Sequence, residues 1–442
     1  MRRTAPRQSG SVIVLVALAL VVMLGIAGLV VDLGRMFVIK AELQNAADAC
    51  ALAAARELNC DPAVAGTCPA TVLAAAQAAG IAVGTRNAVD FQSSAVTIAP
   101  DDVRFSTVLS GANGDDSVYL SIAQGADRNS RYVMCTIPQS GIAMSFMRVL
   151  GFDRETVAAT AVATLAPSQT SCAIPLGLCE ANPGAAPGYG LQVGKWYGGL
   201  FSPGSKVTGS YDWINFNPQG KTPGCNGTGA QVLSCQLAGS GQCSLPAPGS
   251  QVGAQGVDQS VSTAWNSRFG LYKNGAGNPQ LGTAPPDLSG LAFTSASTAG
   301  ASAVTWPAGA NAYAGAAGGG SATDNFVTAR SRFETYQYAT DPMAVGNKYT
   351  NQATSSAQLK SYGSATRRVA IAPLVDCSRL GGSNPQTVPI DGYACVLMLH
   401  PISGPDGVEI EFLGLANTPG NACATSGLPG GSAGPLVPTL VQ

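Results

Sequence analysis

The chain has 442 residues, a formal net charge of -1 and only 11% charged residues. It offers no basic stripe that could neutralise phosphates, so we expect no nucleic-acid partner. Low charge together with 54 glycines and 28 prolines is unusual for a soluble cytosolic enzyme, and it favours an exported protein that packs against others of its kind.

An uncharged run of twenty residues, 12–31, follows a short arm, residues 1–10, that carries three arginines. At ~1.5 Å per residue the run is about 30 Å long as a helix, which is enough to cross the hydrocarbon core of a bilayer. The arginines before the run, against Asp32 after it, favour a cytoplasmic N-terminus and an extracytoplasmic remainder. We therefore predict a single-pass anchor in the lipid bilayer. Its residues include Val12, Leu20, Gly25, Gly28 and Val31.

A cleaved secretory signal is the alternative interpretation of the same run. Such a signal has an apolar region of about 7 to 15 residues, followed by a small-x-small cleavage site. Ala47-Asp48-Ala49 has the right residue types but lies too far downstream. An uncleaved anchor fits the run better, and both interpretations predict export.

The helix is predicted to continue beyond the run through residues 32–58, which contain no proline and are rich in alanine, leucine and glutamate. The predicted anchor and its continuation therefore cover residues 11–59. Apolar residues recur there at spacings of three and four and form one stripe, which we call the helix stripe. Its members are Met36, Ile39, Leu43, Ala46, Cys50 and Ala53. Two interpretations stay open: the stripe covers a sheet of the same chain, or its small residues allow close contact with other subunits.

Residues 60–167 are predicted to form an extracytoplasmic α+β domain, with the long helix packed on a small, mainly antiparallel sheet. The expected elements are helices over 69–83 and 139–150 and strands over 103–108, 117–123, 131–137 and 155–165.

Residues 168–420 are rich in glycine and serine, and we expect a loop-rich, mostly β or irregular lobe that contains disulfides. Strand patterns return near its end, at 368–375, 394–400 and 408–413. The last segment, 421–442, contains many glycines and prolines, and we expect a flexible tail.

Twelve cysteines, without a CxxC motif and with one histidine in the chain, favour disulfides over a zinc site. Cys60 with Cys68, and Cys172 with Cys179, have the spacing of small local loops. Cys50 lies inside the predicted helix and is the best candidate for an unpaired thiol. We expect no metal and no other cofactor.

The residues described above resemble the TadE/TadG-like family of tight-adherence (Flp) pilus assembly proteins. The resemblance rests first on the arginine-rich arm, the apolar run and the sequence VDLGR…ELQNAADA between Val31 and Ala49. A second similarity is FMRVLGFDRETVAATAVATLAP, from Phe146 to Pro167, and a third is RRVAIAPLVDC followed by EIEFLG. Some members of the family carry a von Willebrand A-type domain with a DxSxS metal-binding motif. This motif is absent here, because Leu291 and Leu380 replace its second serine in the two nearest approaches.

The resemblance implies a membrane-anchored, non-enzymatic assembly component in the bacterial inner membrane, with other pilus subunits or assembly proteins as partners. Asp32 and the helix stripe would then form the docking element. Two other functions stay open. One is an exported adhesin-like binding module, whose aromatic residues could stack on a carbohydrate. The other is an envelope enzyme with its site in residues 180–366.

Overall fold

The chain is an α+β protein, as predicted, and it divides into two compact units. The first unit comprises Met1–Ala166 and Val437–Gln442, and the second comprises Pro167–Leu436. The computed structural model describes residues 11–60, 68–109, 116–199, 211–217, 224–227, 229–254, 259–275, 277–294, 304–316, 324–332, 349–351, 356–361, 366–380, 387–402 and 408–441.

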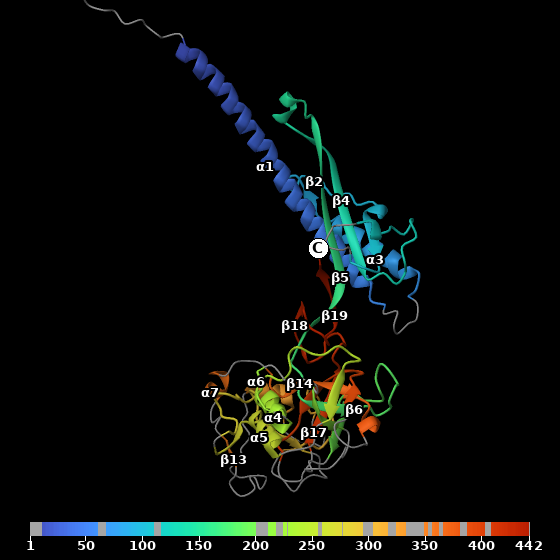
Figure 1. Ribbon diagram of the computed structural model, residues 1–442, viewed down its shortest axis with the longest axis vertical. Helices are drawn as coiled ribbons and strands as arrows, with labels where there is room; N and C mark the ends of the chain where they lie inside the picture. Colours follow the sequence, from blue (N-terminus) through green and yellow to red (C-terminus); the bar gives the residue numbers. More distant parts are fainter. Residues whose placement is uncertain are drawn as a thin grey trace, which may run out of the picture. The chain divides into compact units, whose positions relative to one another are not determined.

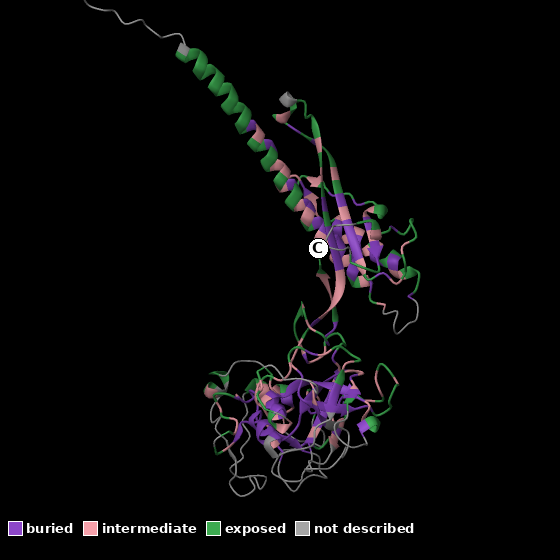
Figure 2. Ribbon diagram, in the orientation of Figure 1, coloured by how far each residue is buried: buried purple, intermediate pink, exposed green. Residues whose placement is uncertain are grey.

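Helix α1, Ser11–Glu57, is 47 residues long and begins the first unit (Figure 1). Its first part exposes apolar side chains, with Val12 at 59% and Leu20 at 52% exposure. From Ile39 onward, one face is buried (Figure 2). It is the one helix among the described residues that is long and apolar enough to cross a bilayer. The change from exposure all round to a one-sided buried face is the pattern expected of a helix that leaves a membrane and enters a domain.

The buried face of α1 packs on a second helix and on three antiparallel strands of a five-stranded sheet. These are α3, Thr71–Gly84, with β3, Val103–Ser106, β4, Tyr132–Ala143, and β5, Arg154–Thr170. Cys135 lies opposite Val103 on one side and opposite Ala161 on the other, which fixes the register of the sheet. The short elements are β1, Ala88–Val89, β2, Ser94–Ala95, η1, Pro100–Asp102, η2, Asp116–Val118, and η3, Met147–Leu150.

The second unit is built around an eight-stranded sheet in the order β15-β9-β8-β6-β14-β16-β17-β7. Its strands are β6, Leu176–Cys179, β7, Trp196–Gly199, β8, Tyr211–Asn215, β9, Gln251–Ala254, β14, Val369–Val375, β15, Thr387–Pro389, β16, Gly392–Met398, and β17, Val408–Leu415. The pair β6 and β14 is parallel, and the other pairs are antiparallel. This lobe, for which we expected mostly β or irregular structure, therefore contains a regular central sheet.

Both faces of this sheet are buried, because alternate residues of its central strands enter two different clusters. On β16, Ala394, Val396 and Met398 pack on one face, and Cys395 and Leu397 pack on the other. Helices α4, Ala230–Ala238, and α5, Gln259–Ser267, contribute to the first face. The remaining elements are β10, Leu271–Lys273, β11, Phe293–Thr294, β12, Val304–Thr305, α6, Phe326–Arg332, β13, Tyr349–Asn351, α7, Ser356–Ser361, and η7, Cys377–Leu380.

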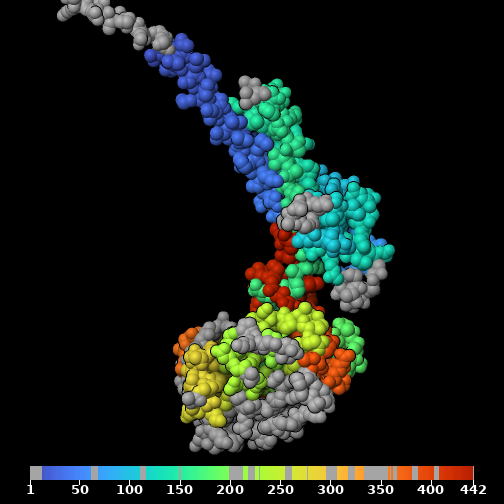
Figure 3. All heavy atoms as spheres, viewed as in Figure 1, coloured from blue at the N-terminus to red at the C-terminus, as the bar shows by residue number. Residues whose placement is uncertain are grey.

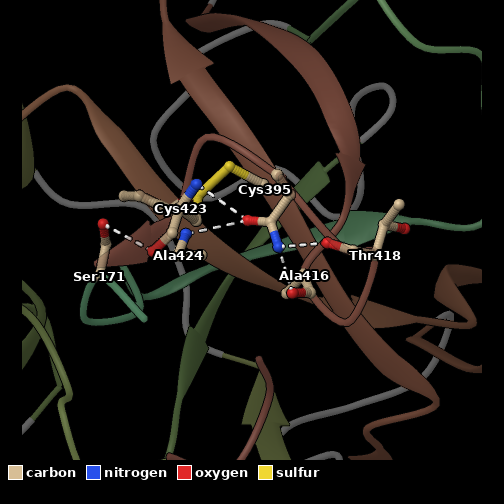
Figure 4. The surroundings of a disulfide bond; sticks show 8 residues. Ser171, Cys395, Ala416, Thr418, Cys423 and Ala424 are labelled. Atoms are coloured by element: carbon tan, nitrogen blue, oxygen red, sulfur yellow. Dashed lines mark hydrogen bonds between the residues drawn. A yellow bond between two sulfur atoms is a disulfide. The ribbon is translucent and has the colours of Figure 1, made fainter. Parts of the chain in front are cut away.

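Six disulfides pair all twelve cysteines, and one of the two predicted local loops is correct. Cys60 bonds to Cys68 as expected. The other local loop is wrong, because Cys172 bonds to Cys243 and Cys179 to Cys377. The remaining bonds are Cys50–Cys135, Cys225–Cys235 and Cys395–Cys423, the last of which is shown in Figure 4.

The expectation of a free thiol at Cys50 was also wrong. The Cys50–Cys135 disulfide joins α1 to β4, because the buried face of the helix lies directly on that strand. A cysteine inside a helix can therefore form a disulfide with a strand that packs against that helix.

Three further expectations differ from the structure. The predicted strand 117–123 is wrong: residues 116–118 form a 3-10 turn, and Leu120 makes only an isolated bridge to Phe105. The predicted helix 139–150 is wrong: residues 139–143 belong to β4, and only 147–150 form a 3-10 turn. Pairing of β4 with β5 overrides the local helical pattern there, with a register shift between Gln139 and Ile142. In the segment expected to be a flexible tail, the structure places β18, Ala424–Pro429, and β19, Leu436–Leu440, both paired with β5.

Ala46 tests whether the helix stripe belongs to the chain's own core. Ala46 has no exposed surface, whereas Ala41, five residues earlier, is exposed. We expect Ala46→Leu to overpack the core and cost about 1–3 kcal/mol of stability. Ala41→Leu, the matched control, should leave stability unchanged. Thermal unfolding of the full chain in detergent measures both, and equal melting temperatures for the two variants would contradict the packing.

Candidate membrane-anchoring site

Asp32, one residue beyond the uncharged run, is buried by the connection between β4 and β5. We call residues 144–153 of this connection the hairpin tip. Asp32 Oδ1 accepts a hydrogen bond from the Ser145 amide at 3.1 Å, and Oδ2 accepts from the amides of Phe146 and Met147 at 2.7 Å each. The residue is only 3% exposed. Three charge-assisted hydrogen bonds offset the cost of removing a carboxylate from water.

Gly28, one helical turn before Asp32, lies directly against the side chain of Phe146. A Cβ atom at Gly28 would be 2.5 Å from Cγ and 2.6 Å from Cβ of Phe146, which is too close for any real contact. These are the first atoms of the Phe146 side chain, so relief would require the tip backbone to move. A Cβ at Gly25 would meet nothing within 4 Å. Glycine is therefore required for close packing at 28 but not at 25.

Arg35 makes the third contact between α1 and this part of the unit. Its Nε and Nη2 donate to the two carboxylate oxygens of Asp90 at 2.8 and 2.6 Å, and its Nη1 donates to the carbonyl of Ala143 at 2.9 Å. The hydrogen-bonded guanidinium lowers the pKa of Asp90. Gly28, Asp32 and Arg35 are four and three residues apart and therefore lie on one face of the helix.

Farther along α1, another side of the helix contacts β5. Lys40 Nζ donates to the carbonyl of Ala158, and Gln44 Nε2 donates to the carbonyl of Thr160 at 3.1 Å. The helix and the hairpin therefore run beside each other from Gln44 to the tip, as Figure 3 shows for the blue helix and the green hairpin.

Residues 10–57, which include this whole face, match the family model described as "Putative Flp pilus-assembly TadE/G-like". The chain therefore has a TadE/G-like N-terminal region. The match supports the resemblance stated from the sequence over these residues, and it supports a pilus-assembly-related role. Neither the comparison with curated proteins nor that with solved structures finds a match to this chain.

The helix stripe of the TadE/G-like region is covered by the chain itself. Ile39, Leu43, Ala46 and Cys50 are all buried in the core that α1 shares with α3 and the sheet, and Met36 packs against its edge. Ala53 is partly exposed, and the fully buried positions nearby are Ala51, Ala54 and Ala55. Of the two interpretations left open by the sequence, the structure therefore favours a stripe that covers a sheet of the same chain.

The predicted anchor residues behave differently from the stripe. Val12, Leu20, Gly25 and Val31 are exposed, and Gly28 is buried under the hairpin tip. The arm before them, residues 1–10, lies outside the described residues. A groove of about 610 Å³ lies between the tip and residues 21–29 of α1. Its lining is Val21, Val22, Leu24, Gly25, Ile26, Leu29, Phe146 and Met147.

The second unit buries two charged networks of its own. Asp287, in one of the two approaches to the metal motif, accepts hydrogen bonds from Arg330 Nε at 3.2 Å and from the Arg367 amide at 2.7 Å. Arg368, fully buried, donates to the carbonyls of Met398 and Leu291 and lies 4.2 Å from the ring centre of Phe269. Burial lowers the pKa of Arg368 to about 9, so the side chain stays charged at neutral pH. Both networks hold the fold together.

A pocket of about 510 Å³ in the second unit lies beside a buried carboxylate. Glu411 accepts hydrogen bonds from Trp196 Nε1 at 2.8 Å and from the Tyr313 amide at 3.2 Å. Burial raises the pKa of Glu411, although these hydrogen bonds act in the opposite direction. Tyr313 and Asn421 also line the pocket, which makes it the candidate ligand site of this unit.

Sequence reasoning placed Asp32 in the family motif but missed its partner, because residues 139–150 were expected to be helical. Gly141 and Gly151, with φ of 73° and 93°, are the signal that could have revealed a turn there.

Gly28→Ala tests the contact between helix and tip, with Gly25→Ala as its control. Both changes raise helix propensity by the same amount, but only the first places a Cβ against Phe146. We expect Gly28→Ala to displace the tip and to accelerate trypsin cleavage after Arg148 in the full chain. Gly25→Ala should be cleaved at the wild-type rate, and identical rates in all three proteins would contradict the contact.

Proposed function

We propose that this protein is a membrane-anchored, non-enzymatic component of a tight-adherence (Flp) pilus assembly system in the bacterial inner membrane. The arm 1–10 is cytoplasmic, and everything from Arg35 onward lies outside the cytoplasm. The observation that carries the proposal is the family match over residues 10–57, which coincides with the apolar run and with the three contacts to the hairpin.

The packing of α1 supports an anchor that stays attached. Cleavage after Ala49 would remove Ile39 and Leu43 from the core of the first unit, and it would separate Asp32 from the hairpin tip. The helix is therefore part of the folded domain as well as its tether.

The disulfides support export. The bonds Cys50–Cys135 and Cys179–Cys377 join residues 85 and 198 positions apart, so they form only as the two units fold. Disulfides of this kind persist in oxidising compartments such as the periplasm and the cell surface.

The surface that contacts other pilus subunits differs from the one expected from the sequence. Because the helix stripe is covered by the chain's own sheet, we assign partner contact to the exposed face of residues 12–31, within the bilayer. Small residues such as Gly25 allow another helix to approach closely there.

An exported binding module is the second candidate function, and the pocket beside Glu411 is the observation that favours it. Its volume of about 510 Å³ falls in the range of small-molecule sites, about 300–1,000 Å³. Tyr313 offers a ring near its wall, whereas the amide of Asn421 is hydrogen-bonded to backbone groups of its own loop. In this case the first unit would present the second outside the cell.

Gene deletion with complementation tests the proposal. We expect the deletion to abolish Flp pili and surface attachment, and expression of the wild-type chain to restore both. An alkaline phosphatase fused after Gln442 should be active, because this enzyme needs an oxidising compartment. Intact pili in the deletion strain, or a reporter active only in the cytoplasm, would contradict the proposal.

A further inference from the structure

The hairpin tip exposes large apolar side chains next to the proposed membrane anchor. Phe146 is 50% exposed and Phe152 is 48% exposed, although both lie on an extracytoplasmic domain with a substantial core of its own. Single exposed apolar residues are common on soluble surfaces. Here Phe146 adjoins exposed apolar side chains of α1 and lines a groove with them, and Phe152 lies on the same tip.

The tip contacts α1 inside the apolar run, before the run ends at Val31. Phe146 packs on Gly28, which lies three residues inside the run that ends at Val31. At ~1.5 Å per residue, this contact is about 5 Å inside the end of the run. The groove beside it extends along the helix to Val21. A helix that spans the bilayer over residues 12–31 therefore carries Phe146 with it to the boundary of headgroups and acyl chains.

Backbone amides of the tip form hydrogen bonds within the protein. This suits an environment poor in water, where an unsatisfied amide is costly. The Asp32 carboxylate accepts hydrogen bonds from the backbone amides of residues 145–147. The Met144 amide donates to the Asp153 carbonyl at 3.1 Å, and the Phe152 amide donates to the Met147 carbonyl at 3.2 Å. The tip thus satisfies these groups with partners inside the protein.

Charged groups flank the apolar side chains of the tip. Arg148 and Asp153 form an ion pair at 3.0 Å, with side-chain exposures of 75% and 72%. Arg154 Nη1 donates to the carbonyl of Gly141 at 3.2 Å. Aromatic residues beside exposed arginines suit the headgroup region, where the ring enters the acyl boundary and the charge stays with the phosphates.

We infer that the hairpin tip inserts into the extracytoplasmic leaflet of the membrane, and that an acyl chain of a bilayer phospholipid fills the groove between the tip and α1. The inference rests on the membrane anchor of the proposed function. The first unit then touches the bilayer at two places, the spanning helix and the tip. Two contacts fix how deep the helix sits and in which direction the domain leaves the membrane.

Tryptophan quenching by brominated phospholipid tests the inference in the full chain. Three variants are reconstituted into vesicles of phosphatidylcholine that carry no bromine, bromine near the headgroup end of the acyl chain, or bromine near its methyl end. Phe152→Trp reports on the tip, Leu20→Trp on the spanning helix, and Phe91→Trp, 66% exposed on the same unit, on the water-facing surface. The four native tryptophans all lie in the second unit, and their emission is subtracted with the wild-type chain.

We expect the added emission of Phe152→Trp and Leu20→Trp to be quenched by the brominated lipid, and that of Phe91→Trp to be unchanged. If Leu20→Trp is quenched while Phe152→Trp behaves like Phe91→Trp, the inference is overturned and the anchor stands. If Leu20→Trp is not quenched, the membrane anchor fails and the inference fails with it. Trypsin digestion of each variant confirms the wild-type fold before reconstitution.

Discussion

The carboxylate of Asp32 is the constraint on which the first unit depends. It stands directly after twenty uncharged residues, where a charge is costly unless hydrogen bonds compensate it. The hairpin supplies three amide donors at this point. To reach Asp32, β4 extends over 12 residues and pairs with residues 154–164 of β5, well beyond the ordinary strand length of about 5–6. The long hairpin and the long helix are therefore two parts of one arrangement.

Buried charges elsewhere in the chain follow the same rule. Glu411 in the second unit is satisfied by an indole N–H and by backbone amides, as Asp32 is by amides alone. Arg368 is the converse case, because its guanidinium donates to backbone carbonyls of β16 and of the segment near Leu291. In a chain with 11% charged residues, these few buried charges lock strands and loops in place through backbone groups.

The sequence could predict what depends on local pattern. Helix α1 and its buried face follow from alanine and leucine at spacings of three and four. Strands β14 and β16 follow from continuous apolar runs, and β17 follows from apolar residues that alternate with Glu409 and Glu411. Pairing between distant segments could not be predicted in this way. Cys179 bonds to Cys377 because β6 lies parallel to β14, with Cys179 opposite Val375, two residues before its partner. The hairpin tip was missed for the same reason, since only pairing with β5 extends β4 from the predicted strand 131–137 through residue 143.

Most of the docking surface proposed for the family motif is now assigned to other roles. Ile39 and Cys50 belong to the chain's core, while Gly28, Asp32 and Arg35 hold the hairpin. The match over residues 10–57 therefore coincides with a structural joint between the long apolar helix and the sheet of the first unit. Under the proposed function, contact with other pilus components is assigned to the exposed face of residues 12–31.

Amide hydrogen exchange at the hairpin tip tests the central claim most directly. In the full chain reconstituted into bilayers, a peptide covering residues 145–147 should be protected in the wild type, because Asp32 holds its three amides. Asp32→Ala should abolish this protection, while a peptide from residues 132–137 of β4, bonded to β5, should exchange as before. Equal protection at the tip in the two proteins would contradict the account.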